Sequence, residues 1–209
     1  MLEKATVEDI PAIESMVNAA YSKYIERIGK LPAPMTEDWD QAVRTREILV
    51  LRDNERTVGS ITIHEDEQTT SLKIDNVVVN PGEQGRGYGY HMIKYAEVEA
   101  LNKGLSSVTL FTNVKMFENI GFYAKLGFVE TDRRMEDGFE RVYFYKNLSE
   151  DFLRLLKFIS ILVEGLRLRS TIPISGALDK YMLNTFFCEN LRGNSSSRNQ
   201  VMGLQIRKH

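Results

Sequence analysis

Apolar residues in the first part of the chain recur at helical spacing, and from Arg46 onward the spacing becomes that of strands. Steps of three and four residues predict a helix that ends near Tyr21, with an apolar face formed by Ile10, Ile13, Met16, Val17 and Ala20. The predicted strands cover residues 2–5, 48–51, 58–64 and 71–79. A polar turn at residues 53–55 joins the second and third of them, which predicts an antiparallel hairpin.

The second half of the chain continues the alternation of strands and helices. One helix ends before Gly104, a natural C-terminal stop, and another covers residues 115–126. The later predicted strands cover residues 107–112, 127–131 and 140–145, and Asp137-Gly138 is a hairpin signal between the last two. A strand, a crossover helix and a second strand imply parallel pairing. The order predicts an α/β fold with a mixed sheet.

Residues 21–35 interrupt this pattern with two prolines, a glycine and a mixture of tyrosines and charges. Two interpretations stay open for the segment, which includes Tyr24 and Arg27. It is either a solvated connection or a wall of an acceptor site.

Charge is distributed unevenly along the 209 residues, of which 43% are hydrophobic and 27% charged. The net charge is −6 over residues 1–148 and +4 over residues 149–209. We therefore expect a domain at 1–148 and a C-terminal extension at 149–209, with a helix over about 150–169 before a largely irregular or disordered part. Four charges within residues 152–168 argue against a membrane span; packing on the domain, on a second subunit as a homodimer, or on a membrane surface all stay open.

The composition also limits the cellular setting and the partners. Net charge is −2, so nothing indicates a nucleic-acid partner. One cysteine, Cys188, excludes an internal disulfide and fits a reducing compartment. The N-terminus lacks the basic and apolar pattern of a signal peptide. We expect a cytoplasmic protein.

The stretch from Val77 to Tyr90 carries the clearest functional pattern. A β-branched run and a proline lead to glycines at alternate positions (Gly85, Gly87 and Gly89), and a helical pattern follows. Free N–H groups and the dipole at a helix N-terminus attract anions, and glycine lets a phosphate approach the backbone. Tyr90 and Met92 stand where a dinucleotide-binding fingerprint needs its third glycine, and no Gly-Lys-Ser/Thr tripeptide follows. The stretch predicts a phosphate site of another kind.

Gln84-x-x-Gly87-x-Gly89, preceded by Val79-x-Pro81, resembles the acetyl-CoA pyrophosphate loop of the GCN5-related N-acetyltransferases (GNAT family). The order of elements over residues 1–147 is similar to that family's fold, which implies a mixed sheet of about seven strands with helices on both faces. The resemblance implies acetyl-CoA as co-substrate, with no metal. It assigns cofactor binding to two backbone segments. These are the pantetheine strand, Val77, Val78 and Val79, and the pyrophosphate loop, Gln84, Gly85, Arg86, Gly87, Tyr88, Gly89 and Tyr90.

Tyr123 has the position of the thiolate-protonating tyrosine that many family members keep just ahead of a Gly-Phe pair, here Gly127-Phe128. The alternative is a core tyrosine packed among aromatic residues. Asn119 lies four residues earlier on the same helical face. Met116 stands where the family often has asparagine, so a cofactor contact at Asn119 is the nearest equivalent.

The general base is less clearly indicated. Where some family members keep a catalytic glutamate, eleven residues before Gln84, this chain has Lys73. Strand alternation predicts that Lys73, Asp75, Val77 and Val79 share one face, which makes Asp75 the natural substitute. A buried aspartate satisfied by backbone groups, or deprotonation through water, are the alternatives. His64 at a strand end is a weaker candidate.

The expected function is transfer of acetyl from acetyl-CoA to a primary amine of a small molecule or peptide, by direct transfer in a ternary complex. Arginines of the last hairpin, Arg133, Arg134 and Arg141, are candidates for contacting a carboxylate or phosphate of the acceptor. The rival interpretation is a non-catalytic module that binds acyl-CoA or a protein partner.

Overall fold

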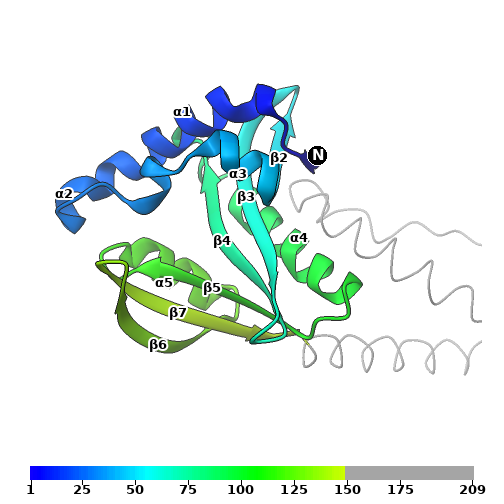
Figure 1. Ribbon diagram of the computed structural model, residues 1–209, viewed down its shortest axis with the longest axis vertical. Helices are drawn as coiled ribbons and strands as arrows, with labels where there is room; N and C mark the ends of the chain where they lie inside the picture. The colour runs from blue at the N-terminus through cyan, green and yellow to red at the C-terminus, as the bar shows by residue number, and fades with distance from the viewer. Residues whose placement is uncertain (149–209) are drawn as a thin grey trace, which may run out of the picture. The chain divides into compact units, whose positions relative to one another are not determined.

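The computed structural model describes residues 1–148 (Figure 1). Its elements in chain order are β1 (Leu2–Lys4), η1 (Val7–Asp9), α1 (Ile10–Tyr21), η2 (Ser22–Tyr24), α2 (Ile25–Ile28), η3 (Ala33–Thr36), α3 (Trp39–Thr45), β2 (Glu47–Asp53), β3 (Arg56–Asp66), β4 (Ser71–Val79), η4 (Pro81–Glu83), α4 (Tyr88–Asn102), β5 (Ser107–Asn113), α5 (Phe117–Lys125), β6 (Val129–Glu136) and β7 (Phe139–Asn147). The predicted domain boundary after residue 148 and the predicted helix over about 150–169 lie outside the described residues. No helix within residues 1–148 has the length and apolar character to cross a bilayer.

Seven strands form one sheet in the order β1-β2-β3-β4-β5-β7-β6. Neighbouring strands are antiparallel except β4 and β5, which pair in parallel across the α4 crossover. The predicted mixed sheet of about seven strands and its parallel pair are confirmed.

The parallel pair is short and the two strands then separate. Only residues 72–74 of β4 pair with residues 108–110 of β5. Figure 1 shows β4 continuing toward α1 while β5 turns toward the β6–β7 hairpin. Residues 76–79 of β4 therefore hydrogen-bond to β3 alone, and their other backbone edge has no strand partner. The two strands thus diverge beyond residue 74 of β4.

Each face of the sheet has its own apolar core. The cluster on the α4 face includes Ile61, Ile63, Leu72, Ile74, Met92 and Ile93. The cluster on the α1 and α3 face includes Ile13, Val17, Trp39, Val43 and Val50. Each such side chain contributes roughly 1.5–3 kcal/mol when it is fully buried. Helices cover both faces, as predicted (Figure 1).

A β-bulge at Asp75 corrects the predicted face of β4. Ile63 pairs with Ile74 while Thr62 pairs with Asn76, so Asp75 is an extra residue in β4. Ile74 therefore lies on the α4 face although it is three residues from Val77, which packs against the same cluster. The prediction that Asp75 shares a face with Val77 and Val79 was wrong, because the bulge shifts the alternation by one residue.

Candidate active site

The glycine-rich loop is tied to the end of β4 by its own side chains. Asn80 Oδ1 accepts a 3.1 Å hydrogen bond from the backbone N–H of Gly82, and Gln84 Nε2 donates a 3.2 Å bond to the carbonyl of Val79. Gly85 and Gly87 have φ of 82° and 86°, in the left-handed region that favours glycine. The sequence thus folds into a loop whose shape depends on glycine.

The first turn of α4 offers free donors. Gly87 is the N-cap residue and has no side chain to accept from the turn, and the first intrahelical bond runs from His91 N–H to the Gly87 carbonyl. Within residues 1–148 the N–H groups of Tyr88, Gly89 and Tyr90 have no hydrogen-bond acceptor. Donors of this kind at a helix N-terminus suit the pyrophosphate of acetyl-CoA.

Two side chains of the loop are directed to other protein groups. The Tyr88 hydroxyl donates a 2.6 Å bond to Asp53 at the end of β2. Arg86 pairs with Glu83, and its Nη2 lies 3.6 Å from an Asp53 carboxylate oxygen. Arg86 does not line the cleft described next.

The loop, the end of β4, α1 with η2, and α5 enclose a cleft of about 450 Å³. All the predicted cofactor-binding residues except Arg86 line this cleft, including the unpaired end of β4. The full lining is Ala20, Tyr21, Lys23, Tyr24, Val77, Val78, Val79, Gln84, Gly85, Gly87, Tyr88, Gly89, Tyr90, Glu118, Asn119, Phe122 and Tyr123.

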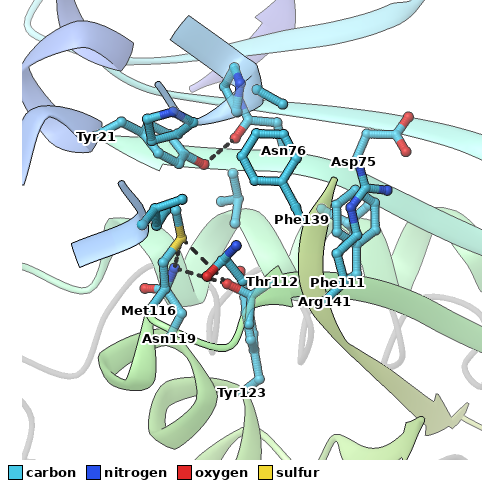
Figure 2. Close-up of a pocket in the computed structure, with 17 residues that line it drawn as sticks. Tyr21, Asp75, Asn76, Phe111, Thr112, Met116, Asn119, Tyr123, Phe139 and Arg141 are labelled. Carbon is cyan, nitrogen blue, oxygen red and sulfur yellow. Dashed lines mark hydrogen bonds between the residues drawn. The ribbon is translucent and has the colours of Figure 1, made fainter. Parts of the chain in front are cut away.

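A smaller cavity of about 70 Å³ adjoins the cleft (Figure 2). The two spaces share four lining residues, Tyr21, Val77, Asn119 and Tyr123. The rest of the smaller cavity is bounded by α2 and the segment before α3, by the bulge of β4, by β5 and the residues between β5 and α5, and by β7. These residues are Ile28, Pro32, Ala33, Pro34, Ile74, Asp75, Asn76, Phe111, Thr112, Asn113, Met116, Phe139 and Arg141.

Tyr123 stands at the junction and is only 6% exposed. Its ring packs against Phe128 and Phe144, with centroids 6.1 and 5.7 Å away. The hydroxyl has no hydrogen-bond partner among the described residues. Burial, and secondarily the phenol of Tyr24, raise the pKa of Tyr123 above its ordinary value. The phenol is therefore a protonated donor at neutral pH.

Asn119 lines both spaces from one turn before Tyr123. Its Nδ2 donates a 3.4 Å bond to Oγ1 of Thr112 on β5, and Met116 Sδ lies 3.7 Å from the same nitrogen (Figure 2). Met116 is buried and is the N-cap residue of α5.

The carboxylate of Asp75 lies on the β4 bulge beside His64 of β3. Oδ2 of Asp75 is 2.7 Å from Nδ1 of His64, and Oδ1 is 3.8 Å from Nζ of Lys73. Among residues 1–148, His64 is the hydrogen-bond partner of the Asp75 side chain, and no backbone group donates to it, in contrast to the alternative interpretation. Asp75 lines the smaller cavity.

Comparison with known families decides what kind of protein has this arrangement. A family model described as the acetyltransferase (GNAT) family matches residues 13–128, from α1 to the turn that follows α5. The matched range contains the loop, the diverging strands and Tyr123. The chain belongs to the GNAT family.

Solved structures share the GNAT fold with this chain at low sequence identity. The ribosomal-protein-S18-alanine N-acetyltransferase from Escherichia coli is 17% identical, with a TM-score of 0.56 over 71% of this chain and 93% of that one. PaiA N-acetyltransferase from Thermoplasma acidophilum, in complex with coenzyme A, is 16% identical, with a TM-score of 0.56 over 70% and 98%. The yncA protein from Salmonella typhimurium, with acetyl-CoA, is 17% identical, with a TM-score of 0.55 over 71% and 93%. A comparison of the sequence with curated proteins gives no match.

The acceptor-side residues predicted for this GNAT domain do not all reach the same space. Tyr24 is buried and lines the larger cleft. Arg27 lines neither space and pairs with Glu118 of α5 at 2.8 Å. Arg134 also lines neither, is 54% exposed, and pairs with Asp132 at 2.9 Å.

The other two hairpin arginines are paired as well. Arg133 makes a two-bond contact with Glu130, at 2.6 and 3.0 Å. Arg141 lines the smaller cavity but pairs with Glu136 and Asp137. Because these guanidinium groups already have carboxylate partners, the GNAT domain offers no unpaired arginine of this hairpin to an anionic acceptor.

Tyr21 begins the segment 21–35, which was interpreted either as a solvated connection or as a wall of an acceptor site, and it lines both spaces. Its hydroxyl donates a 2.7 Å bond to Oδ1 of Asn76, and burial, followed by the nearby Tyr123 and Tyr24, raises its pKa. The sequence did not indicate Phe122 of the cleft or Phe139 of the smaller cavity as site residues. Their positions depend on contacts between distant segments, for which local sequence carries no signal.

Proposed function

We propose that this GNAT protein transfers the acetyl group of acetyl-CoA directly to a primary amine while both substrates are bound. The observation that supports this best is the junction at Tyr123. A cleft suited to the donor and a smaller cavity suited to an amine share its side chain and the edge of β4 at Val77. An acetyl group and a nucleophile held from opposite sides would meet there.

The donor fits the cleft by its backbone groups. The free N–H groups of Tyr88, Gly89 and Tyr90 would bind the pyrophosphate, and the unpaired edge of β4 at residues 77–79 would hydrogen-bond the pantetheine arm. An N–H of the same edge would stabilise the oxyanion that forms during transfer. Acetyl-CoA supplies the thioester when bound.

Tyr123 would act as the general acid. Its hydroxyl is free to donate, and burial raises its pKa, so the proton is present at neutral pH. The aromatic contacts hold the ring in one orientation. The proton would go to the departing thiolate sulfur.

Asp75 would act as the general base for an amine in the smaller cavity. It is the one carboxylate among the residues that line this cavity. The acceptor would be a small-molecule or peptide amine whose amino group enters the smaller cavity. Tyr24 would contact the donor side, whereas Arg27 and Arg134 would influence the acceptor only from outside these spaces.

The donor site is tested by isothermal titration of acetyl-CoA into wild type, Gly87→Asp and Gly104→Asp. Both glycines have positive φ, and both flank α4, but Gly104 is at the far end. Gly87→Asp adds a carboxylate where phosphates are expected, so its Kd should rise at least tenfold. Gly104→Asp should bind as wild type does. Equal affinity of the two variants for acetyl-CoA would contradict the assignment of the Gly87 loop as the pyrophosphate site.

Turnover separates the enzyme from a non-catalytic module. We would follow thiol release from acetyl-CoA with a panel of primary amines: 1,4-diaminobutane, tryptamine, lysine amide and an alanyl peptide. Release above the acceptor-free rate with at least one amine supports transfer. Binding of acetyl-CoA without release across the panel would favour the module.

A further inference from the structure

Asp75 separates the smaller cavity from a second, shallow one. The shallow cavity has a volume of about 370 Å³ and lies beside the start of β2 and the last residues of β3. It is lined by Thr45, Arg46, Glu47, Ile63, His64, Glu65 and Asp75. Asp75 is the only residue common to the linings of these two spaces. Asp75 is thus the residue at which the two spaces meet, and its carboxylate contacts His64 of the shallow cavity.

His64 contacts the Asp75 carboxylate from the side of the shallow cavity. The bulge places Asp75 beside His64, with 2.7 Å between Oδ2 and Nδ1. His64 is 44% exposed and Asp75 25%, so exposure increases from the aspartate to the imidazole. With Nδ1 engaged, Nε2 is the ring nitrogen left to exchange with water.

Acetylation of an ammonium acceptor requires an outlet for one proton. The nitrogen changes from three hydrogens to one as its bond to the acetyl carbon forms and the carbon–sulfur bond breaks. One proton ends on the thiolate sulfur. The other must reach solvent. We propose that it leaves through Asp75 and His64: the carboxylate takes it from the nitrogen, and His64 Nε2 releases a proton into the shallow cavity. This inference rests on the proposed acetyl transfer.

The other charged groups near His64 and Asp75 do not compete for the contact between these two side chains. Lys103 of the α4 end binds Glu65 at 3.0 Å and Glu47 at 3.6 Å, so both nearby carboxylates have a cation of their own. Lys73 lies 3.8 Å from the other oxygen of Asp75, beyond hydrogen-bond distance. Arg46 pairs with Glu37 at 3.2 Å. Asp75 is the carboxylate that contacts the imidazole.

The experiment uses the full chain and the amine from the panel that wild type acetylates fastest. His64→Gln removes the titratable ring at an exposed position, and Glu67→Gln changes the nearby β3–β4 turn without touching Asp75. At pH 7, kcat of His64→Gln should fall about tenfold or more, which is less than the roughly 100-fold or larger effect of removing a group that transfers the proton directly. The Kd for acetyl-CoA should match wild type. Glu67→Gln should keep kcat.

The pH profile distinguishes proton release from a structural role. An alkyl amine loses its own proton near pH 10, so the deficit of His64→Gln should shrink as the pH rises. Imidazole in solution should restore part of the activity of His64→Ala. A deficit that is constant with pH and not restored by imidazole would overturn the proton path.

A double-mutant cycle with Asp75→Asn tests whether the two residues act together. If they share one path, His64→Gln should add little to Asp75→Asn, whereas multiplicative effects would overturn the inference. Wild-type kcat in the His64 variants would overturn the path and leave the proposed function standing. Absence of turnover in wild type with every amine would overturn both.

Discussion

The hydroxyl of Tyr21 donates a 2.7 Å hydrogen bond to the side-chain oxygen of Asn76, and this bond joins the end of α1 to the bulge of β4. Both residues line the smaller cavity, and Tyr21 also lines the cleft (Figure 2). Because the raised pKa of Tyr21 keeps the phenol protonated, the bond persists through neutral pH. The bond thereby ties α1, on one face of the sheet, to the Asn76 side chain of β4.

Tyr21→Phe should loosen this connection. It removes the donor and leaves the Asn76 oxygen in a partly buried place, which should lower the free energy of unfolding by about 1–2 kcal/mol. The acceptor KM should rise more than the acetyl-CoA Kd, because Asn76 lines only the acceptor cavity of the two. Urea unfolding and steady-state kinetics measure both effects. Tyr95→Phe, on α4, is the control, and equal stability of the two variants would contradict the prediction.

Tyr123→Phe should separate catalysis from packing. The ring contacts with Phe128 and Phe144 stay, so the protein should fold and bind acetyl-CoA with a Kd within about threefold of wild type, while kcat falls about 100-fold. Since burial raises the pKa of Tyr123, wild-type kcat should show no loss from ionisation of this phenol below about pH 10. Unchanged kcat in the variant would remove the assignment. The exposed Tyr145→Phe is the matched control.

Elements that depend on local signals could be predicted from the sequence. Asp137-Gly138 forms the predicted hairpin turn, with φ of 50° and 72° at the two residues. Gly104 ends α4 in the left-handed conformation, as predicted. The loop glycines, Gly85 and Gly87, have the positive φ that makes their pattern recognisable. In each case, the residue type itself favours the left-handed backbone conformation that the structure shows.

Features that depend on pairing between distant segments could not be predicted. The extra residue at Asp75 is specified by the register of β3, and alternation along β4 alone gives the wrong face. Helix α3 follows a proline-rich segment and begins at the capping residue Asp38, which the apolar pattern did not reveal. The arginines of the hairpin have the right type for acceptor binding, but their carboxylate partners appear only in the folded structure.

The Arg27–Glu118 ion pair should control how fast the donor leaves. It joins α2 to α5, and Glu118 lines the cleft. Because both side chains are more than one third exposed, neutralising one should change stability by less than about 1 kcal/mol. Dissociation of acetyl-CoA should become about two- to fivefold faster in Arg27→Gln and in Glu118→Gln. Stopped-flow displacement measures the rates.

The double variant provides the internal check on that pair. If the bridge is responsible, Arg27→Gln and Glu118→Gln together should release acetyl-CoA no faster than either alone. Additive effects would mean that each side chain acts independently. High salt should reduce the difference between wild type and the single variants, because the pair is exposed to screening.

Asp9 should make stability depend on acidic pH. Its side chain is 6% exposed; burial alone would raise its pKa, but the Thr6 N–H at 3.0 Å and Arg52 at 2.7 Å outweigh this effect and lower it. A lowered folded-state pKa means that the carboxylate stabilises the fold above the unfolded pKa of about 3.9, and that this contribution disappears as the pH falls below it. Asp9→Asn should lower the free energy of unfolding at pH 7 by about 1–3 kcal/mol.

The pH dependence makes the Asp9 prediction specific. The stability difference between wild type and Asp9→Asn should be constant from pH 7 to about pH 5 and should narrow below about pH 4, where the wild-type carboxyl gains a proton. Urea unfolding at a series of pH values measures it. Asp40→Asn, at an exposed pair with Arg44, should have a much smaller effect at pH 7. A difference that persists unchanged at pH 3 would show that Asp9 stabilises the fold by its shape rather than by its charge.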